Sequence, residues 1–171
     1  MTLWQPTLRG EGFVATPLLE GDFDALFLAA SDPEIWALHP VRDRYTRPKF
    51  ELYFRTGLDS GGALIVRDPV TGEVLGSSRF VGHDPAARSV EIGYSFLVRS
   101  RWGTGLNGAV KASMLAHAFT HVDLVEFYVG VNNHRSRRAM EKLGAETLRT
   151  VCEREPEGDL RESVVYGIRR R

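Results

Sequence analysis

An apolar strand, a glycine-rich loop and a helix follow one another between Ser95 and Ala118, and this stretch constrains the fold more than any other. The loop runs from Trp102 to Asn107 and contains Gly103 and Gly105. Glycine has no Cβ, so a ligand can approach its backbone closely. The first turn of the following helix presents N–H groups without intrahelical partners, which favour an anion. The stretch therefore predicts a site for a phosphate ester.

Other glycine-rich loops have further requirements that this one does not meet. A mononucleotide-binding loop ends in Gly-Lys-Ser/Thr, and no such triplet follows Gly105. Gly103, Gly105 and Gly108 have the spacing of a dinucleotide-binding loop. The acidic residue that such a fold needs at the end of a second strand is absent, because Asp123 lies between the predicted helix and strand. A nucleotide-binding domain stays as one alternative.

Hydrophobic periodicity and turn residues divide the rest of the chain into short elements. Strands are expected at 13–18, 63–67, 74–80, 89–98, 125–131, 146–154 and 161–168, and the segment 81–88 is expected to be a loop. Helices are expected at 23–30, from Pro33, from Arg47 to a close within Gly57 to Gly62, at 107–121, and from Asn133 to a stop at Gly144. This order predicts a mixed α/β sheet with helices on both faces.

The helix after the glycine-rich loop carries a stripe of small residues, which would let it approach the sheet closely. The stripe consists of Ala109, Ala112, Ala116 and Phe119, and Lys111 is the one Lys, Arg, Asp or Glu in the helix. Cys152, the single cysteine, is expected in a half-buried strand position, and thiolate metal clusters and internal disulfides are excluded.

Length and charge narrow the class of protein. A chain of 171 residues is long enough for one domain, here taken as 1–171. Lys plus Arg and Asp plus Glu are both 22, so charge gives no reason to expect nucleic acid or a membrane as partner. The N-terminus lacks the basic and apolar regions of a leader, and no apolar run is long enough to span a membrane. We therefore expect a cytoplasmic protein without a metal, and a homodimer is compatible with the sequence.

Three motifs in their order resemble the GNAT superfamily of N-acetyltransferases, and within it the RimJ/RimL-like branch. They are Glu91-Ile92-Gly93-Tyr94, then Trp102-Gly103-Thr104-Gly105-Leu106-Asn107, then Asn133-His134-Arg135-Ser136 followed by Glu141-Lys142-Leu143-Gly144-Ala145. The resemblance covers Phe13 to Ile168. It implies a GNAT-like mixed, mostly antiparallel central sheet with a splayed strand pair, and acetyl-CoA as co-substrate.

The resemblance also implies which residues bind the coenzyme. Backbone groups of Leu97, Val98 and Arg99 would pair with the pantetheine arm, and N–H groups from Gly103 through Thr104, Gly105 and Leu106 to Asn107 would bind the pyrophosphate. Asn133 would bond the pantetheine arm, and Ser136 would lie near the thioester sulfur. Trp102 and Asn107 stand where the family commonly has Arg or Gln and Gly or Ala, although Trp102 resembles a tryptophan of some RimL-like members.

Amine acetylation needs a neutral nucleophile, support for an oxyanion and a proton for the departing thiolate. Glu91, acting through a water, is the first candidate base, and Glu155 is the second. The N–H of Leu97 is the candidate oxyanion donor. Many GNAT enzymes place a tyrosine seven residues after the motif asparagine as the acid, but this chain has Met140 there. Ser136, and then Tyr94, are the substitutes.

The function expected from the sequence is acetyl transfer from acetyl-CoA to a primary amine, either a peptide or protein N-terminus or a small molecule. In GNAT-like folds the early helices form one wall of the acceptor cleft, so Trp36, Tyr53 and Tyr94 are candidates for substrate contact. The missing tyrosine keeps an alternative open, a non-catalytic acyl-CoA-binding sensor or scaffold module.

Overall fold

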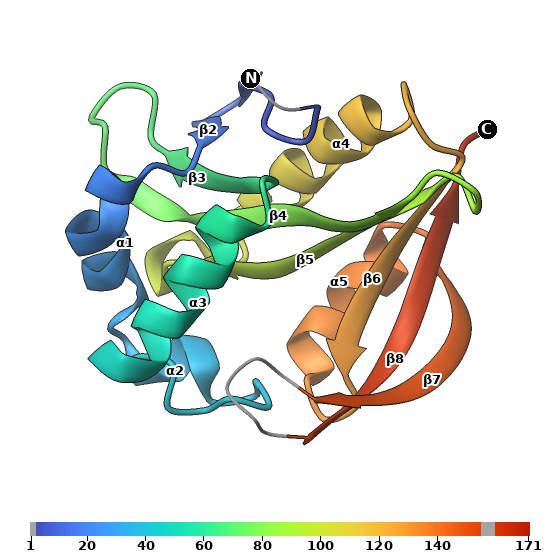
Figure 1. Ribbon diagram of the computed structural model, residues 1–171. Coiled ribbons are helices and arrows are strands. Elements are labelled where there is room, and N and C mark those ends of the chain that lie inside the picture. The colour runs from blue at the N-terminus through green and yellow to red at the C-terminus, as the bar shows by residue number, and fades with distance from the viewer. Residues whose placement is uncertain (1–2, 155–159) are drawn as a thin grey trace.

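A computed structural model describes residues 3–154 and 160–171, which form a mixed sheet with helices on both faces (Figure 1). The eight described strands lie in the order β1-β2-β3-β4-β5-β6-β8-β7. The strands are β1 (Leu8–Gly10), β2 (Phe13–Pro17), β3 (Ala63–Arg67), β4 (Val74–Asp84), β5 (Ser89–Leu97), β6 (Leu124–Gly130), β7 (Glu146–Arg154) and β8 (Leu160–Arg169). The helices are α1 (Phe23–Ala30), α2 (Pro33–Trp36), α3 (Arg47–Asp59), α4 (Leu106–Ala118) and α5 (His134–Lys142), with short 3-10 turns η1 (Glu20–Asp22) and η2 (Arg99–Arg101).

Two hydrophobic clusters hold the helices against the sheet. One contains the inward side chains of α4 together with Val90 and Ile92 of β5 and Met140 of α5. The other joins α1, α2 and α3 to the sheet through aromatic side chains such as Trp36 and Phe96. The clusters lie on opposite faces of β5, and Figure 1 shows α3 in front of this strand with α4 on the other side. The predicted arrangement of helices on both faces is confirmed.

The sheet opens between β5 and β6, which form the one parallel pair among the described strands. Their pairing begins at Ser89 and Leu124 and ends at Glu91 and Glu126. Beyond that point β5 stays paired with β4 as far as Leu97, and β6 stays paired with β8 as far as Gly130. The two strands therefore diverge, as Figure 1 shows, and the predicted splayed pair in a mostly antiparallel sheet is confirmed.

A β-bulge in β5 changes which residues face each side of the sheet. Ser77 pairs with Phe96 and Arg79 with Gly93, so two steps along β4 oppose three along β5. Tyr94 lies in the left-handed region with a φ of 52°. Its carbonyl accepts a hydrogen bond of 2.6 Å from the hydroxyl of Tyr53 in α3. An extra residue in one strand of a pair reverses the alternation beyond it.

The consequence of the bulge is visible in the packing of β5. Ile92 and Leu97 both belong to the α4 side, although they are five residues apart. Tyr94 and Phe96 pack on the side of α1 to α3. Ser95, between them, points toward α4, where it meets Lys111. A regular strand would have put Ile92 and Leu97 on opposite faces.

Several expectations about individual elements were wrong. The expected loop at 81–88 begins only after Asp84, because β4 continues along β5, and β1 was not predicted. By contrast, α3 ends at Asp59, inside the segment Gly57 to Gly62 that was expected to close it. A Cβ at Gly57 would lie 3.1 Å from Nη2 of Arg79, so this glycine makes room for a buried guanidinium. The expected stop at Gly144 is confirmed by its φ of 74° just after α5.

Two expectations about exposure also differ from the structure. Cys152 lies in a strand as predicted, but it is exposed, because β7 is the edge strand and most of its side chains are uncovered. On α4 the buried residues are Leu106, Val110, Lys111, Met114 and Ala118, whereas Ala112 and Ala116 of the expected stripe are exposed. The large side chains fill the space against the twisted sheet.

Among the described helices, none combines the length and apolar character of a membrane span.

Candidate functional site

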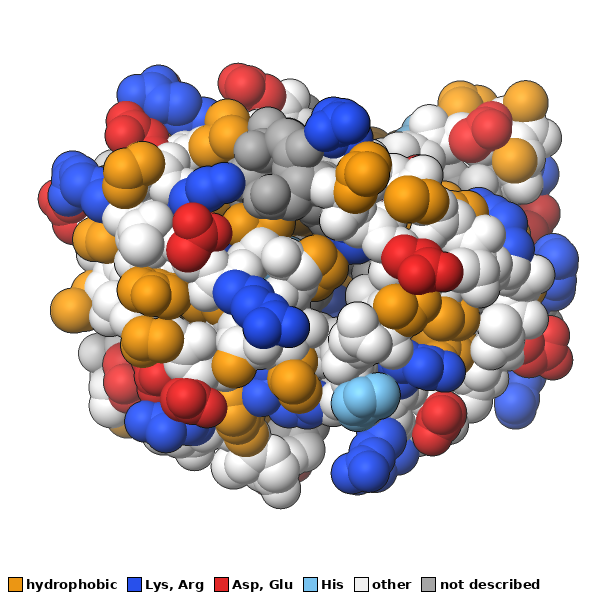
Figure 2. Space-filling view, turned by 90° about the horizontal axis from the view of Figure 1, so that it is seen from below, with side chains coloured by type: hydrophobic (Ala, Val, Ile, Leu, Met, Phe, Trp, Pro, Cys, Tyr) orange, Lys and Arg blue, Asp and Glu red, His pale blue; other side chains and the backbone are white. Residues whose placement is uncertain are grey.

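A cavity of about 700 Å³ lies where β5 and β6 separate. Its walls come from the facing stretches of these two strands, from the N-terminal turns of α4 and α5, and from α2 with the residues that follow it. The face of the molecule that Figure 2 shows is hollowed near its middle, with Lys and Arg side chains beside the hollow. Because neither strand has a partner on this side, their backbone groups are available to a ligand that enters the gap.

The N-terminus of α4 forms one end of the cavity. Gly103 and Gly105 line it, and their φ values of 73° and 88° lie in the left-handed region. Gly105 is the N-cap of α4, a helix of 13 residues. The hydroxyl of Thr104 donates to the carbonyl of Arg101 at 2.7 Å and so fixes the loop. Successive N–H groups at such a turn and at a helix N-terminus form a concave anion site.

The charge of the cavity is also suited to an anion. Its lining includes Lys111, Arg135, Arg138, Lys142 and Arg161, and no Asp or Glu among the described residues. The guanidinium of Arg135 stacks on the ring of Trp102 with its Cζ 3.8 Å from the ring centroid, which links α5 to the loop before α4. The described part of the lining therefore favours a ligand with several negative charges.

The N-terminus of α5 faces α4 across the cavity. Asn133, only 8% exposed, caps α5 by accepting a hydrogen bond of 3.2 Å from the N–H of Ser136. Ser136 lines the cavity one turn into the helix, and Met140 follows one turn later with 4% of its surface exposed. The capping role of Asn133 is a local reason for the sequence to form this helix.

Two hydrogen bonds show which backbone groups of β5 face the gap. The N–H of Val98 donates to the carbonyl of Leu75 at 2.8 Å, toward β4. Neighbouring residues of a strand direct their backbone groups to opposite sides, so the N–H of Leu97 points away from β4 and into the gap. The indole N–H of Trp102 donates to the carbonyl of Leu97 at 3.0 Å on that same side.

Comparison with known proteins gives the family of this architecture. Residues 14–146 match the model of the acetyltransferase (GNAT) domain, which is more than half of the chain. The chain belongs to the GNAT acetyltransferase family. The family implies acetyl transfer with coenzyme A as the acyl carrier. No curated protein matches the sequence.

Solved GNAT proteins have the same fold at low sequence identity. A GCN5-related N-acetyltransferase from Brucella melitensis is 20% identical with a TM-score of 0.82, over 96% of this chain and 79% of that one. RimJ of Mycobacterium smegmatis, solved with CoA-disulfide, is 22% identical with a TM-score of 0.74, over 98% and 88%. A spermidine N-acetyltransferase from Vibrio cholerae, solved with CoA and spermine, is 14% identical with a TM-score of 0.72, over 94% and 96%. These likenesses establish the GNAT fold.

The structure brings most of the residues expected from the GNAT motifs to one cavity. Those in the lining are Trp36, Tyr94, Leu97, Trp102, Gly103, Gly105, Asn107, Asn133 and Ser136. Those outside the lining are Tyr53, Glu91, Val98, Arg99, Thr104 and Leu106. The guanidinium of Arg99 turns the other way and pairs with Asp32 at 2.9 Å. Glu155 lies outside the described residues.

The aromatic candidates for acceptor contact have different environments. Trp36 is 2% exposed, donates its indole N–H to the carbonyl of Ala30 at 2.8 Å, and forms part of the cavity wall. Tyr53 is 3% exposed and uses its hydroxyl to hold the bulge at Tyr94. Burial, with the nearby guanidinium of Arg44, holds the pKa of His39 in the same wall well below its usual value. The imidazole is therefore neutral at pH 7.

Glu91 lies at the last paired position of β5, where the gap begins. A Cβ at Gly93 would meet its Oε1, so the missing side chain of Gly93 leaves room for the carboxylate. The charge of Glu91 acts on groups of two other elements. Burial lowers the pKa of Lys111 in α4, and Glu91 opposes this effect. Burial raises the pKa of Tyr128 in β6, and Glu91 raises it further. Glu91 thus lies where β5 and β6 begin to separate, next to the cavity but outside its lining.

Lys111 is a cavity residue that the motifs did not indicate. Its side chain is 4% exposed, and its Nζ donates to Ser78 Oγ at 3.0 Å and to Ser95 Oγ at 2.5 Å. Burial lowers its pKa to about 7, with an opposing effect from Glu91. Lys111 is spaced three and seven residues before Met114 and Ala118, which are core residues, so the helical period contained a signal for its burial.

Proposed function

We propose that this GNAT protein transfers the acetyl group of acetyl-CoA to a primary amine by direct attack on the thioester. The amine is the N-terminus of a peptide or protein, or a small molecule. The observation that carries the proposal is the gap between β5 and β6, with the glycine-capped N-terminus of α4 at its end. This gap offers unpaired strand edges to an extended amide-containing arm and N–H groups to its phosphates.

The cavity fits coenzyme A by the chemistry of its donors. Gly103, Gly105 and Asn107 would hold the pyrophosphate through N–H groups, and the basic lining matches an anion with several phosphate charges. The backbone of β5 around Leu97 and the side chain of Asn133 would hold the pantetheine arm. Val98 is not among these groups, because its N–H is bonded to Leu75, its carbonyl accepts from Arg101, and it lies outside the cavity lining. Acetyl-CoA is a substrate here and is consumed in each turnover.

The acceptor amine must lose a proton, and Glu91 is the proposed base through a water. Its carboxylate is at the start of the gap, and its charge raises the pKa of Tyr128 in β6. An α-amine has a pKa near 8, so a useful fraction is neutral at pH 7 and assistance need only be modest. The N–H of Leu97, directed into the gap, is the proposed support for the oxyanion.

We further place the chain in the RimJ/RimL-like branch. The spacing from Trp102 to Asn107 and from Asn133 to Ala145 supports this placement. The structural likeness to RimJ of Mycobacterium smegmatis is compatible with it. The described lining has no carboxylate that would attract a polyamine, so we favour an N-terminal α-amine over an acceptor with several positive charges.

Thiol release tests the function. The protein is incubated with acetyl-CoA and a panel of dipeptides, amino acids and polyamines, and free thiol is followed with time. An acetyltransferase releases thiol in proportion to acetylated product when one class of amine is present. Absence of release with every amine, while calorimetry shows coenzyme binding, would contradict the proposal.

A second function is favoured by one observation. Met140 occupies the position at which many GNAT enzymes have an acidic tyrosine, and a thioether cannot donate a proton. A non-catalytic module that binds acyl-CoA as a sensor or scaffold would show affinity without turnover. The same panel separates the two functions, because only the enzyme consumes acetyl-CoA.

A further inference from the structure

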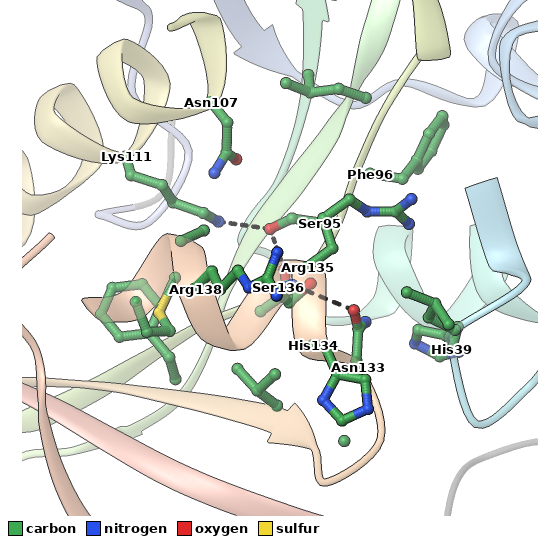
Figure 3. A pocket seen from close by; sticks show the side chains of 18 of the residues that line it. His39, Ser95, Phe96, Asn107, Lys111, Asn133, His134, Arg135, Ser136 and Arg138 are labelled. Carbon is green, nitrogen blue, oxygen red and sulfur yellow. Dashed lines mark hydrogen bonds between the residues drawn. The ribbon is translucent and has the colours of Figure 1, made fainter. Parts of the chain in front are cut away.

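A buried ammonium and two hydroxyls form a cluster on the coenzyme side of the gap. Lys111 of α4 donates to Ser78 of β4 and to Ser95 of β5, and the two hydroxyl oxygens lie 2.7 Å apart. Ser78 is 2% exposed, whereas Ser95 is exposed and lines the cavity. Figure 3 shows Lys111 and Ser95 pointing toward each other, with Asn107 on the same helix. Ser95 therefore connects the buried ammonium with the cavity.

The cluster depends on the bulge in β5. With Tyr94 in the left-handed region, Ser95 is turned toward α4 instead of toward α3. The hydroxyl of Tyr53 holds this conformation through the carbonyl of Tyr94. A strained residue that is fixed by a hydrogen bond from a buried side chain points to a functional constraint on the side chain that it orients.

The surroundings of Lys111 suit a group that gives and takes a proton. The ring of Phe127 from β6 lies 6.0 Å from its Nζ, and Ser78 and Ser95 are its hydrogen-bond acceptors. Glu91 of β5 is the ionisable group whose charge acts on it, and burial opposes that charge and lowers the pKa to about 7. Near neutral pH both protonation states are populated.

In the proposed reaction the proton donor for the departing thiolate is still to be assigned. When the C–S bond breaks, its electron pair goes to sulfur, and the thiolate must gain a proton to leave as the free thiol. Met140 cannot supply it. Ser136 lies across the cavity near the N-terminus of α5, and its hydroxyl is the competing donor. Ser95 is a cavity hydroxyl that accepts a hydrogen bond from the ammonium of Lys111.

We propose that Ser95 is the proton donor to the coenzyme A thiolate and that Lys111 is the positioning residue that returns a proton to Ser95. The proposal rests on the acetyl transfer described above. Sulfur takes the hydroxyl proton of Ser95, and Ser95 takes a proton from Nζ of Lys111. The attacking amine loses its extra proton to Glu91 or water, and the neutral lysine regains one from solvent, so protons balance over the turnover.

Four variants test this assignment in the full chain with acetyl-CoA and the best amine of the panel. Ser95→Ala removes the donor, Lys111→Met removes the charge, and Ser136→Ala removes the competing hydroxyl. Ser113→Ala is the matched control, because Ser113 is in the same helix but outside the cavity lining. We expect kcat to fall at least about tenfold in Ser95→Ala and Lys111→Met, with KM for acetyl-CoA changed less than about threefold. Ser113→Ala should match the wild type.

The pH profile distinguishes proton supply from a merely structural role. Because the protonated lysine is needed, kcat of the wild type should fall as pH rises through the pKa of Lys111. Lys111→Arg keeps the charge at every working pH but does not release a proton, so its kcat should stay low and the descending limb should be lost. An unchanged limb in Lys111→Arg would overturn the role of Lys111.

A readout without turnover completes the test. Carbon NMR of the lysine ε-methylene follows the titration of Lys111 directly, and we expect a midpoint near 7 that moves in Ser95→Ala. A midpoint that stays near 10.5 would contradict the proposal. If the wild type turns over and Ser95→Ala keeps its rate, or if Ser136→Ala alone is impaired, this proposal fails by itself. If the wild type binds coenzyme without releasing thiol, the proposed function fails and this proposal with it.

Discussion

The bulge in β5 gives the sharpest prediction about how sequence sets the site. Tyr53→Phe removes one hydroxyl and leaves the ring in place. That hydroxyl is in a side chain 3% exposed and donates to the carbonyl of Tyr94 at 2.6 Å. Tyr94 itself has a φ of 52°, a conformation that non-glycine residues adopt only when neighbours hold it. The change therefore removes a support of a strained residue.

The size of the effect follows from the loss of one part-buried hydrogen bond. Such a bond contributes about 1 kcal/mol, and a carbonyl left without its donor raises the cost to about 1–3 kcal/mol. We expect the free energy of unfolding of Tyr53→Phe to fall by about 1–2 kcal/mol. For a domain of this size that corresponds to a decrease in Tm of about 2–8 °C. Because the bulge orients Ser95, turnover should fall as well.

Urea unfolding and thiol release measure the two effects. Tyr45→Phe is the matched control, since the ring of Tyr45 packs against the same hydrophobic cluster as Tyr53. It removes a hydroxyl from the same residue type without touching the bulge. Equal stability and equal kcat in Tyr53→Phe and Tyr45→Phe would refute the claim that Tyr53 holds the bulge.

Three other changes test separate parts of the site. Gly105→Ala should cost about 1–2 kcal/mol of stability in urea unfolding because Gly105 has a φ of 88°, and Gly105→Glu should abolish coenzyme affinity in calorimetry; unchanged affinity would count against the phosphate site. Lys111 has a pKa of about 7 in the native state and 10.5 in the unfolded chain, so the native state binds fewer protons between these pH values. The free energy of unfolding should therefore rise with pH across this window in the wild type, and rise less in Lys111→Met. Parallel curves of unfolding free energy against pH would show that Lys111 titrates normally. Glu91→Gln should lower kcat most at low pH with little change in KM, and equal rates at every pH would remove Glu91 as the base.

The glycine-rich loop and its neighbours were predictable because they follow local rules. Gly103 and Gly105 have the left-handed conformation that their residue type allows, and Asn133 caps α5 as its side chain favours. The order of strands and helices gave the mixed sheet, and the family resemblance gave the gap between β5 and β6. The loop conformation and the helix cap depend on residues close together in the chain, and the gap was known only through the family resemblance.

The features that were missed depend on contacts between distant segments. Gly57 lies inside α3 and leaves the space of its absent Cβ to Arg79, 22 positions later. The left-handed Tyr94 is held by Tyr53, which lies 41 residues earlier. Lys111 is buried because strands β4 and β5 supply hydroxyl partners. A single sequence shows the residue types but not which of them meet across the sheet.

The most direct test of the central claim is a crystal structure of the protein with coenzyme A. We predict that the pyrophosphate lies within hydrogen-bonding distance of the N–H groups of Gly103 and Gly105, with the pantetheine arm between β5 and β6. Coenzyme bound elsewhere, or a gap closed by pairing of these strands beyond Glu91 and Glu126, would contradict it.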